Sequence, residues 1–297
     1  MPPIRILFQS SIPFTEDDWH VGRFSAVVET LRGLRQGDGS PLASVTARNR
    51  EVDATGRDPV LTGLSRRDFD ELWLFAVDGG EACNDVECAA IDAFQRAGGG
   101  VLTARDHQNM GLWLRKLRGV GAANCFHADL FREPDESRWC RDDEETRTID
   151  FPNYHSGANG DAQPVSAVEP LHPLLMRPGG GRIEWLPSHP HEGAVVPPAG
   201  DPRARSVARG RSTTTGRPFH LSVAFERNGE FAGRGLAESS FHHFADYNWN
   251  PAAGAPSFVT EKPGSGLKQN PEALEHTRAY VENLVHWLAP SDVSPGI

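Results

Sequence analysis

The sequence predicts an α/β protein built on a doubly wound, mainly parallel β-sheet, as one domain over residues 1–290. Two observations predict this fold class. Apolar, strand-like runs alternate along the chain with segments of helical spacing, and right-handed crossovers between parallel strands leave few other topologies. One run, residues 72–77, is apolar throughout, which is typical of a central strand covered on both faces. The length of 297 residues fits one large domain with an insertion.

The expected elements follow from local patterns in chain order. Runs of β-branched and aromatic residues between turn residues predict strands at 4–9, 44–52, 69–77, 101–103, 182–186 and 219–225. Apolar residues at helical spacing predict helices at 19–34, 86–94, 111–117 and 271–289. Pro271 at the first helical position and Pro290 beyond the last turn support the final helix. The acidic, turn-rich residues 129–170 are expected to form an inserted lobe, and the basic residues 203–217 a solvated loop.

Composition and charge restrict the classes of function. The formal net charge is −10, and phosphate affinity needs clustered Lys and Arg, so we expect no nucleic-acid partner. No apolar run has the length to span a bilayer, and the N-terminus lacks a signal-peptide pattern. The four cysteines form no CxxC pair, which favours reduced thiols. We therefore expect a cytoplasmic protein with a small-molecule ligand and no membrane partner, and a homodimer as the commonest oligomer.

Three polar clusters each follow a predicted strand: Asp78-Gly79-Gly80, Arg105-Asp106-His107-Gln108 and His189-Pro190-His191-Glu192. Because the carboxyl ends of parallel strands share one edge of a sheet, we expect the clusters to converge on one crevice. Asp106 beside His107 indicates a general base with its orienting partner. The alternative is a helix-capping Asp with His107 packed behind it. Glu192 could orient His189 or His191 in catalysis, or form a surface ion pair with the Arg-rich loop.

In order and spacing, these clusters resemble motifs of the class I glutamine amidotransferase-like superfamily over about residues 1–195. Asp78-Gly79-Gly80 is similar to the family's Gly-Gly turn, whose backbone amide helps to form an oxyanion hole. Residues 104–108 are similar to its Cys-x-Gly-His-Gln elbow, which carries the nucleophile. His189-Pro190-His191-Glu192 is similar to its late His-Pro-Glu segment, which supplies a base and an orienting carboxylate. The resemblance implies a flavodoxin-like fold.

Within the superfamily, the chain is most similar to the ThuA-like, or trehalose-utilisation, branch. The Gly98-Gly99-Gly100-Val101 lead-in and the Leu171-His172-Pro173-Leu174 segment resemble features of that branch. This resemblance implies at most a sugar-related role. The histidine-rich residues 241–249 are not part of the branch's pattern.

Departures from the family pattern bear directly on function. Ala104 stands where the elbow has its cysteine, and alanine has no nucleophilic atom for acyl transfer. Asp106 replaces the elbow glycine, and the His-to-Glu spacing is one residue longer. The sequence therefore predicts that the protein is not a glutaminase. Cys83 could supply a thiol instead, but acidic neighbours raise a thiol pKa and oppose reactivity; they are Glu81, Asp85 and Glu87.

Residues 241–249 hold a second group of candidate side chains. On a strand, His242 and His243 would face opposite sides, so one at most would point into a given pocket. Two His and one carboxylate form a common ligand set for Zn or non-haem Fe. The candidate ligands of a divalent metal are His191, His242, His243 and Asp246, with His189 as an alternative to His191. The other interpretation has no cofactor: the histidines hydrogen-bond buried loop carbonyls above packed aromatic rings.

Two functions from different classes remain. The first is a hydrolase or isomerase of a small polar metabolite, carbohydrates included, that uses a His/carboxylate cluster with or without a metal. Its expected catalytic residues are Asp106, His107, His189, His191 and Glu192. The second is a catalytically inactive ligand-binding or assembly protein of the same fold. In both cases the expected substrate-binding residues are Asp78, Gly79, Gly80, Arg105, Gln108, Tyr247 and Asn248.

Overall fold

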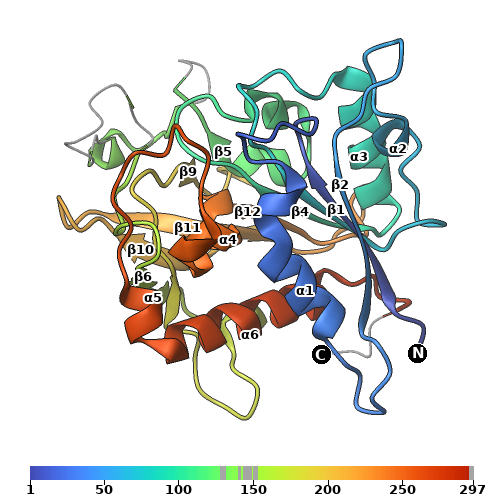
Figure 1. The fold of residues 1–297 in the computed structure, drawn as a ribbon. Helices are drawn as coiled ribbons and strands as arrows, with labels where there is room; N and C mark the ends of the chain where they lie inside the picture. Colours follow the sequence, from blue (N-terminus) through green and yellow to red (C-terminus); the bar gives the residue numbers. More distant parts are fainter. Residues whose placement is uncertain (128–131, 140–141, 143–148, 150–152, 294–297) are drawn as a thin grey trace.

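The computed structural model describes residues 1–127, 132–139, 142, 149 and 153–293. Within them, the central sheet has the strand order β2-β1-β3-β4-β12-β11-β10-β7 (Figure 1). Its parallel half consists of β1 (Ile4–Ser10), β2 (Ala43–Asn49), β3 (Glu71–Phe75), β4 (Gly100–Ala104) and β12 (Gly235–Glu238). With β12 as the fifth parallel strand, this is the 2-1-3-4-5 order of flavodoxin-like folds. The predicted α/β class with a doubly wound, mainly parallel sheet is confirmed.

Beyond β12 the sheet is antiparallel. β11 (Pro218–Phe225) pairs with β12, β10 (Ala204–Arg211) pairs with β11, and the short β7 (Ser166–Ala167) follows β10. The predicted solvated loop at 203–217 is therefore wrong over its first half. Arg209 and Arg211 are exposed, but they alternate with the buried Ala208 and Gly210. This alternation is that of a strand with one solvated and one buried face.

Helices cover both faces of the parallel half (Figure 1). α1 (Ser25–Gly33) and α6 (Pro271–Leu288) pack on one face, against strand residues that include Phe8 and Trp73. α2 (Pro59–Thr62) and α3 (Asp85–Arg96) cover the opposite face, against residues that include Leu7 and Leu72. Successive residues of a strand point to opposite faces, so β1 and β3 each contribute to both cores.

Some elements differ in type from the prediction. The segment at 111–117 forms the 3-10 helix η2 (Leu112–Lys116), and η3 (Val120–Ala123) follows it. At Gly121 a side chain would collide with the carbonyl oxygen of Leu114, so the two short helices pack too closely there for any residue larger than glycine. The predicted helix at 19–34 divides into η1 (Val21–Phe24) and α1. The run at 182–186 contributes β8 (Trp185–Pro187), which pairs with β6 (Ala162–Pro164) outside the main sheet.

The remaining short elements are β5 (Asn124–Cys125), η5 (Glu136–Arg138), η6 (Pro173–Leu175), β9 (Ala194–Val195), η7 (Phe241–His243), α4 (Asp246–Trp249), η8 (Pro251–Ala253) and α5 (Gly266–Gln269). The predicted inserted lobe at 129–170 falls partly outside the described residues, so its limits, like the single domain over 1–290, stay a prediction. Among the described helices, none combines the length and the apolar character needed to cross a membrane.

Three chain segments meet at the carboxyl edge of the parallel strands. β4 and β12 are neighbours in register, with Ala104 opposite Glu238, so the residues that follow them lie side by side. The segment at 188–193 passes between the two ends. A side chain at Gly193 would come within 2.5 Å of the Asp106 carbonyl oxygen and 2.8 Å of the Ser239 carbonyl oxygen. Only glycine therefore allows the three backbones to lie this close together.

Candidate functional site

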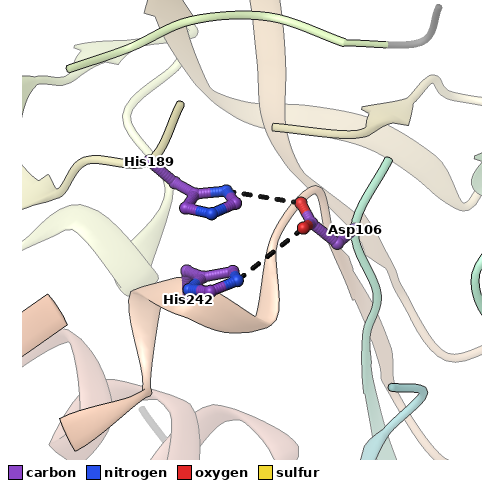
Figure 2. Close-up of side chains that lie close together, drawn as sticks. All are labelled: Asp106, His189 and His242. Atoms are coloured by element: carbon purple, nitrogen blue, oxygen red, sulfur yellow. Dashed lines mark ion pairs between the residues drawn. The ribbon is translucent and has the colours of Figure 1, made fainter. Parts of the chain in front are cut away.

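Three buried side chains, one from each segment, form a trio: Asp106, His189 and His242 (Figure 2). Asp106 Oδ1 lies 3.5 Å from His189 Nδ1, and Asp106 Oδ2 lies 3.7 Å from His242 Nε2. The two imidazole rings stack, with centroids 3.5 Å apart and 11° between their planes. One ligand atom from each residue lies within 4.8 Å of the other two, so the trio could hold a metal ion.

The surroundings of His242 fix the position of its proton. Asn248 Nδ2 donates to the Ser188 carbonyl at 2.9 Å. A backbone carbonyl only accepts, so the orientation of the Asn248 amide is determined and its Oδ1 faces His242 Nδ1 at 2.8 Å. His242 Nδ1 therefore carries the hydrogen, and Nε2 presents a lone pair toward Asp106. Burial lowers the pKa of His242 well below its usual value, so the ring is neutral.

His189 also presents a lone pair near the carboxylate. Its Nδ1 accepts the backbone N–H of His191 at 3.2 Å, so this nitrogen carries no hydrogen. Burial lowers the pKa of His189. An ionised carboxylate and two nitrogen lone pairs repel one another unless a cation lies among them.

The donor spacing in the trio fits a metal ion better than hydrogen bonds. With ligand bonds of about 2.0–2.2 Å, neighbouring ligands of a tetrahedral ion lie roughly 3.3–3.6 Å apart. The observed separations are 3.5 Å to Asp106 Oδ1 and 3.7 Å to Asp106 Oδ2, within and just above this range, whereas an N–H···O hydrogen bond would shorten them to about 2.7–3.2 Å. The stacked rings must turn apart for both nitrogens to point at one ion. The donor set and spacing therefore fit, and the ring orientation requires adjustment.

The trio and His107 line a cavity of about 350 Å³. His107 Nδ1 lies 2.9 Å from Asp106 Oδ2, which leaves Nε2 as the nitrogen that can exchange a proton with a ligand. This volume lies at the lower end of the range for small-molecule sites. The described lining consists of Trp19, Asp106, His107, Met110, Ile149, His189, His191, Phe241, His242, Phe258, Val259, Thr260 and Glu261.

Arg105 supports the turn that carries these residues. Its buried guanidinium donates to the backbone carbonyls of residues 108, 110 and 125, at 2.6, 3.0 and 2.8 Å. Burial lowers the pKa of Arg105 to about 10. Gln108 has a φ of 52°, and no other non-glycine residue in the described ranges has a positive φ. Such strain persists only where surrounding contacts impose it, and Arg105 provides them here.

His191 also lines the cavity. Its Nε2 lies 2.9 Å from Glu261 Oε1, and its ring centroid lies 5.3 Å from those of His107 and His189. The hydrogen bond with His191 lowers the pKa of Glu261 to about 2, so this carboxylate is ionised. Glu261 belongs to residues 254–264, which we call the strap; they form most of the long loop between α4 and α5 (Figure 1).

His243 points away from the cavity into a group that we call the buried clamp: Glu192, Glu238, His243 and Tyr280. His243 Nδ1 lies 3.1 Å from Glu238 Oε2, and Nε2 lies 3.2 Å from Glu192 Oε2. Burial acts against the charge, but the two carboxylates raise the pKa of His243 to about 10, so it is an imidazolium. Tyr280 of α6 donates to Glu238. The clamp thus ties the last helix to β12 and to the 188–193 segment.

The predicted metal ligands lie in different environments. Of His191, His242, His243 and Asp246, only His242 belongs to the trio; His189, the predicted alternative to His191, also belongs to it, with Asp106 as the third member. Asp246 lies elsewhere, because its carboxylate accepts the backbone N–H groups of Ser25 and Ala26 at 2.9 and 2.7 Å and so caps α1. His191 binds Glu261, and His243 lies in the clamp. The expected strand at 242–243 is η7, although the two side chains do face different surroundings.

The predicted catalytic residues lie in two places, and the predicted substrate-binding residues lie outside the described cavity lining. Asp106, His107, His189 and His191 line the cavity, whereas Glu192 is buried in the clamp and accepts from Ser156 and Ser239, each at 2.8 Å. The described lining includes none of Asp78, Gly79, Gly80, Arg105, Gln108, Tyr247 and Asn248. Asp78 instead accepts from the hydroxyl of Ser11 at 2.6 Å and from the indole of Trp113 at 2.9 Å. Asp78, Arg105 and Asn248 thus hydrogen-bond within the loops around the site.

The two positions considered for a nucleophile carry no reactive group. Ala104 is the last residue of β4 and is fully buried. Cys83 is also buried, and burial raises the pKa of its thiol well above the usual value, with Glu87 adding to the shift. A buried thiol with a raised pKa is not a nucleophile at neutral pH.

Sequence patterns do not identify eight of the described lining residues as site residues: Trp19, Met110, Ile149, Phe241, Phe258, Val259, Thr260 and Glu261. Trp19 falls on an apolar helical stripe, which predicts a core residue. Phe258 and Glu261 lie in the strap, whose turn-rich sequence has no periodicity. The sole available signal is an aromatic residue and a carboxylate in a loop that follows the histidine-rich segment.

No family model matches the sequence, and no curated relative matches it. Among solved structures, a putative ThuA-like protein from Parabacteroides merdae is 13% identical, with a TM-score of 0.45 over 89% of this chain and 96% of that one. The glutaminase domain of Trypanosoma brucei CTPS with bound acivicin is 14% identical, with a TM-score of 0.44 over 98% of each chain. A putative GMP synthase protein from Thermoplasma acidophilum is 9% identical, with a TM-score of 0.39 over 96% of this chain and 94% of that one. At these values the likeness carries no argument about activity.

Proposed function

We propose that this chain is a metal-dependent hydrolase of a small molecule. Asp106, His189 and His242 would hold one divalent ion, Zn²⁺ or Fe²⁺, and His107 would serve as general base. The observation that carries the proposal is the fixed proton of His242. Asn248 accepts a hydrogen bond from Nδ1, so a bare Nε2 faces the Asp106 carboxylate at 3.7 Å. A hydrogen-bond partner that fixes the tautomer is typical of a metal-ligating histidine, and two His with one carboxylate suit Zn or Fe.

The chemistry follows from the residues that line the cavity. When bound, a divalent ion supplies a Lewis acid that lowers the pKa of a coordinated water. His107 donates from Nδ1 to Asp106, and its Nε2 can accept a proton from a water in the cavity. Neither Ala104 nor Cys83 offers a nucleophile, so the route is direct attack by water. A glutaminase mechanism that needs a thiol is not part of this proposal.

Metal binding is the first test. Elemental analysis and calorimetric titration with Zn²⁺ and Co²⁺ should give one equivalent per chain, and Asp106→Asn, His189→Ala or His242→Ala should each abolish it. His276→Ala is a matched control, because His276 is buried and its Nδ1 also accepts a backbone N–H, from Glu184 at 3.1 Å, far from the cavity. Wild-type protein that binds neither ion, or His242→Ala protein that binds as well as wild type, would refute the proposed ligands.

Turnover is the second test. We expect hydrolysis of p-nitrophenyl esters that a chelator removes and added metal restores. His107→Asn should lower kcat by about 10²–10⁴-fold while metal binding stays intact. Metal-loaded protein that binds small molecules but hydrolyses no ester or amide would instead favour the ligand-binding alternative, in which the crevice is kept without catalysis.

A further inference from the structure

The strap forms one wall of the cavity and is held at several points. Near its start, the backbone N–H of Ser257 donates to Asp17 at 2.6 Å, and the Ser257 hydroxyl donates to the same carboxylate. At its end, the N–H of Gly264 donates to the Asn159 carbonyl at 2.8 Å. Between these points Glu261 contacts His191, as described above. The strap is therefore fixed at both ends and in the middle.

Phe258 is held over the cavity by its neighbours in the strap. Its side chain lines the cavity, yet 57% of its surface is exposed. On one side Ser257 is bound to Asp17; on the other, Val259 donates its N–H to the Pro256 carbonyl at 3.0 Å and packs against the core. The backbone on both sides of Phe258 is therefore held, and its partly exposed ring lies at the edge of the cavity. An aromatic ring at a cavity rim gains free energy when a ligand covers it.

The described lining divides by chemistry into two parts. The carboxylates and imidazoles form one connected polar group. The remaining side chains are apolar apart from Thr260: Trp19, Met110, Ile149, Phe241, Phe258 and Val259. The ring centroid of Trp19 lies 4.7 Å from that of His242, so the apolar wall begins directly beside the trio. A ligand whose polar group reaches the trio therefore places its remaining atoms against carbon.

A free sugar does not suit this wall. Its hydroxyl groups surround the ring, so some of them would meet the apolar side chains, and each one that leaves water without a hydrogen-bond partner costs free energy. Thr260 is the one hydroxyl in the described lining. A molecule with one polar end and one apolar end matches both parts, since the apolar end gains from leaving water.

We propose that the substrate is an amphiphilic carbonyl compound: an ester or amide with an aromatic or branched aliphatic group that contacts Phe258. This inference rests on the proposed hydrolase function for the reacting bond and on the apolar wall for the rest. In the reaction the hydroxyl of water adds to the acyl carbon, the C–O or C–N bond breaks, and the second proton of water goes to the departing alcohol or amine. No further reactant is required.

The test measures binding without turnover. Zn²⁺-loaded protein is titrated with benzamide and, separately, with methyl β-D-glucopyranoside, and dissociation constants are taken from ligand-observed NMR. We expect benzamide to bind at least about tenfold more tightly than the glucoside. Phe258→Ala should weaken benzamide binding about tenfold, as expected for the loss of one covered aromatic face. Phe14→Ala is the matched control, because Phe14 is 67% exposed and does not belong to the described lining.

Each result decides the inference separately from the proposed function. Tighter binding of the glucoside, equal benzamide binding by wild type and Phe258→Ala, or no binding of either probe would overturn the amphiphilic substrate. Benzamide binding that depends on Phe258 in a protein that hydrolyses nothing would support this inference and refute the hydrolase. Ester hydrolysis that is unchanged in Phe258→Ala would support the hydrolase and refute the amphiphilic substrate.

Discussion

Two adjacent histidines have opposite chemical states in this protein. His242 is neutral and directs a lone pair at Asp106 beside the cavity, whereas His243 is charged and lies between Glu192 and Glu238 without access to the cavity. Both rings are buried, so burial alone does not separate them. The difference lies in their partners. The N–H of His242 donates to the neutral amide oxygen of Asn248, whereas His243 lies between two carboxylates. Partners therefore decide which buried histidine is available for a metal and which is structural.

The largest expected effect tests the structural half of this comparison. His243→Ala leaves two buried carboxylates without their cation, which should lower the free energy of unfolding by about 3–5 kcal/mol. Urea denaturation of the metal-free proteins measures the loss. His242→Ala is the matched control and should cost markedly less, because its partner Asn248 is neutral and keeps its bonds to Ser188 and Asn159. Equal losses in the two variants would show that the two sites do not differ as described.

A smaller effect tests the functional half. Asn248→Ala removes the acceptor that keeps the proton on His242 Nδ1, so the ring can present either nitrogen to Asp106. The affinity for Zn²⁺ should fall about 10–100-fold, as for other losses of a metal ligand's orienting partner. Calorimetric titration measures it, with Asn250→Ala as a control, since Asn250 caps η8 outside the described cavity lining. Unchanged affinity would mean that the tautomer of His242 is not set by Asn248.

The pH dependence of stability gives a further contrast between the two histidines. The folded-state pKa of His243 is about 10, above its ordinary value of 6.5. Its contribution to stability is therefore complete below pH 6.5, declines above that value and is lost as the pH passes through about 10. Unfolding free energies at pH 7 and pH 9.5 should fall more steeply in wild type than in His243→Gln, whose side chain does not titrate. Parallel profiles in the two proteins would contradict a charged His243.

No effect is expected at the Cys83 thiol. Cys83→Ala should leave metal affinity and any ester hydrolysis unchanged, because the native thiol is buried with a strongly raised pKa. Iodoacetamide should modify Cys83 only after denaturation, which mass spectrometry of digested samples can measure. Modification of the native protein with loss of hydrolysis would place a thiol in the reaction and displace the trio from it.

The fold can be predicted where local pattern and tertiary environment agree. The continuous apolar run at 72–77 corresponds to the central β3, and the two prolines bracket α6 within a residue or two. The prediction is wrong at β10, where every second residue near its end is an arginine and the run resembles a loop by composition. A strand at the antiparallel side of a sheet tolerates such alternation, but composition alone does not reveal it.

For the site, position after a strand indicates Asp106 and His107, and the His-Pro-His-Glu segment indicates His189. The partners could not be predicted, because they depend on contacts between residues far apart in the chain. His242 meets Asp106 across 136 positions, and the Asp246 carboxylate caps a helix 220 positions away. Whether His242, His243 or Asp246 joins the trio depends on how the chain turns at η7, and sequence spacing does not determine that turn.

The insertion of β12 between β4 and β11 has a consequence for biosynthesis. The ribosome completes β4 at residue 104, but its sheet neighbour begins only at residue 235. During that interval one side of a buried, apolar strand has no backbone partner, and such an edge readily pairs with other chains. Nascent chains truncated between these points should therefore depend on chaperones, and the crevice can assemble only after most of the polypeptide has left the exit tunnel.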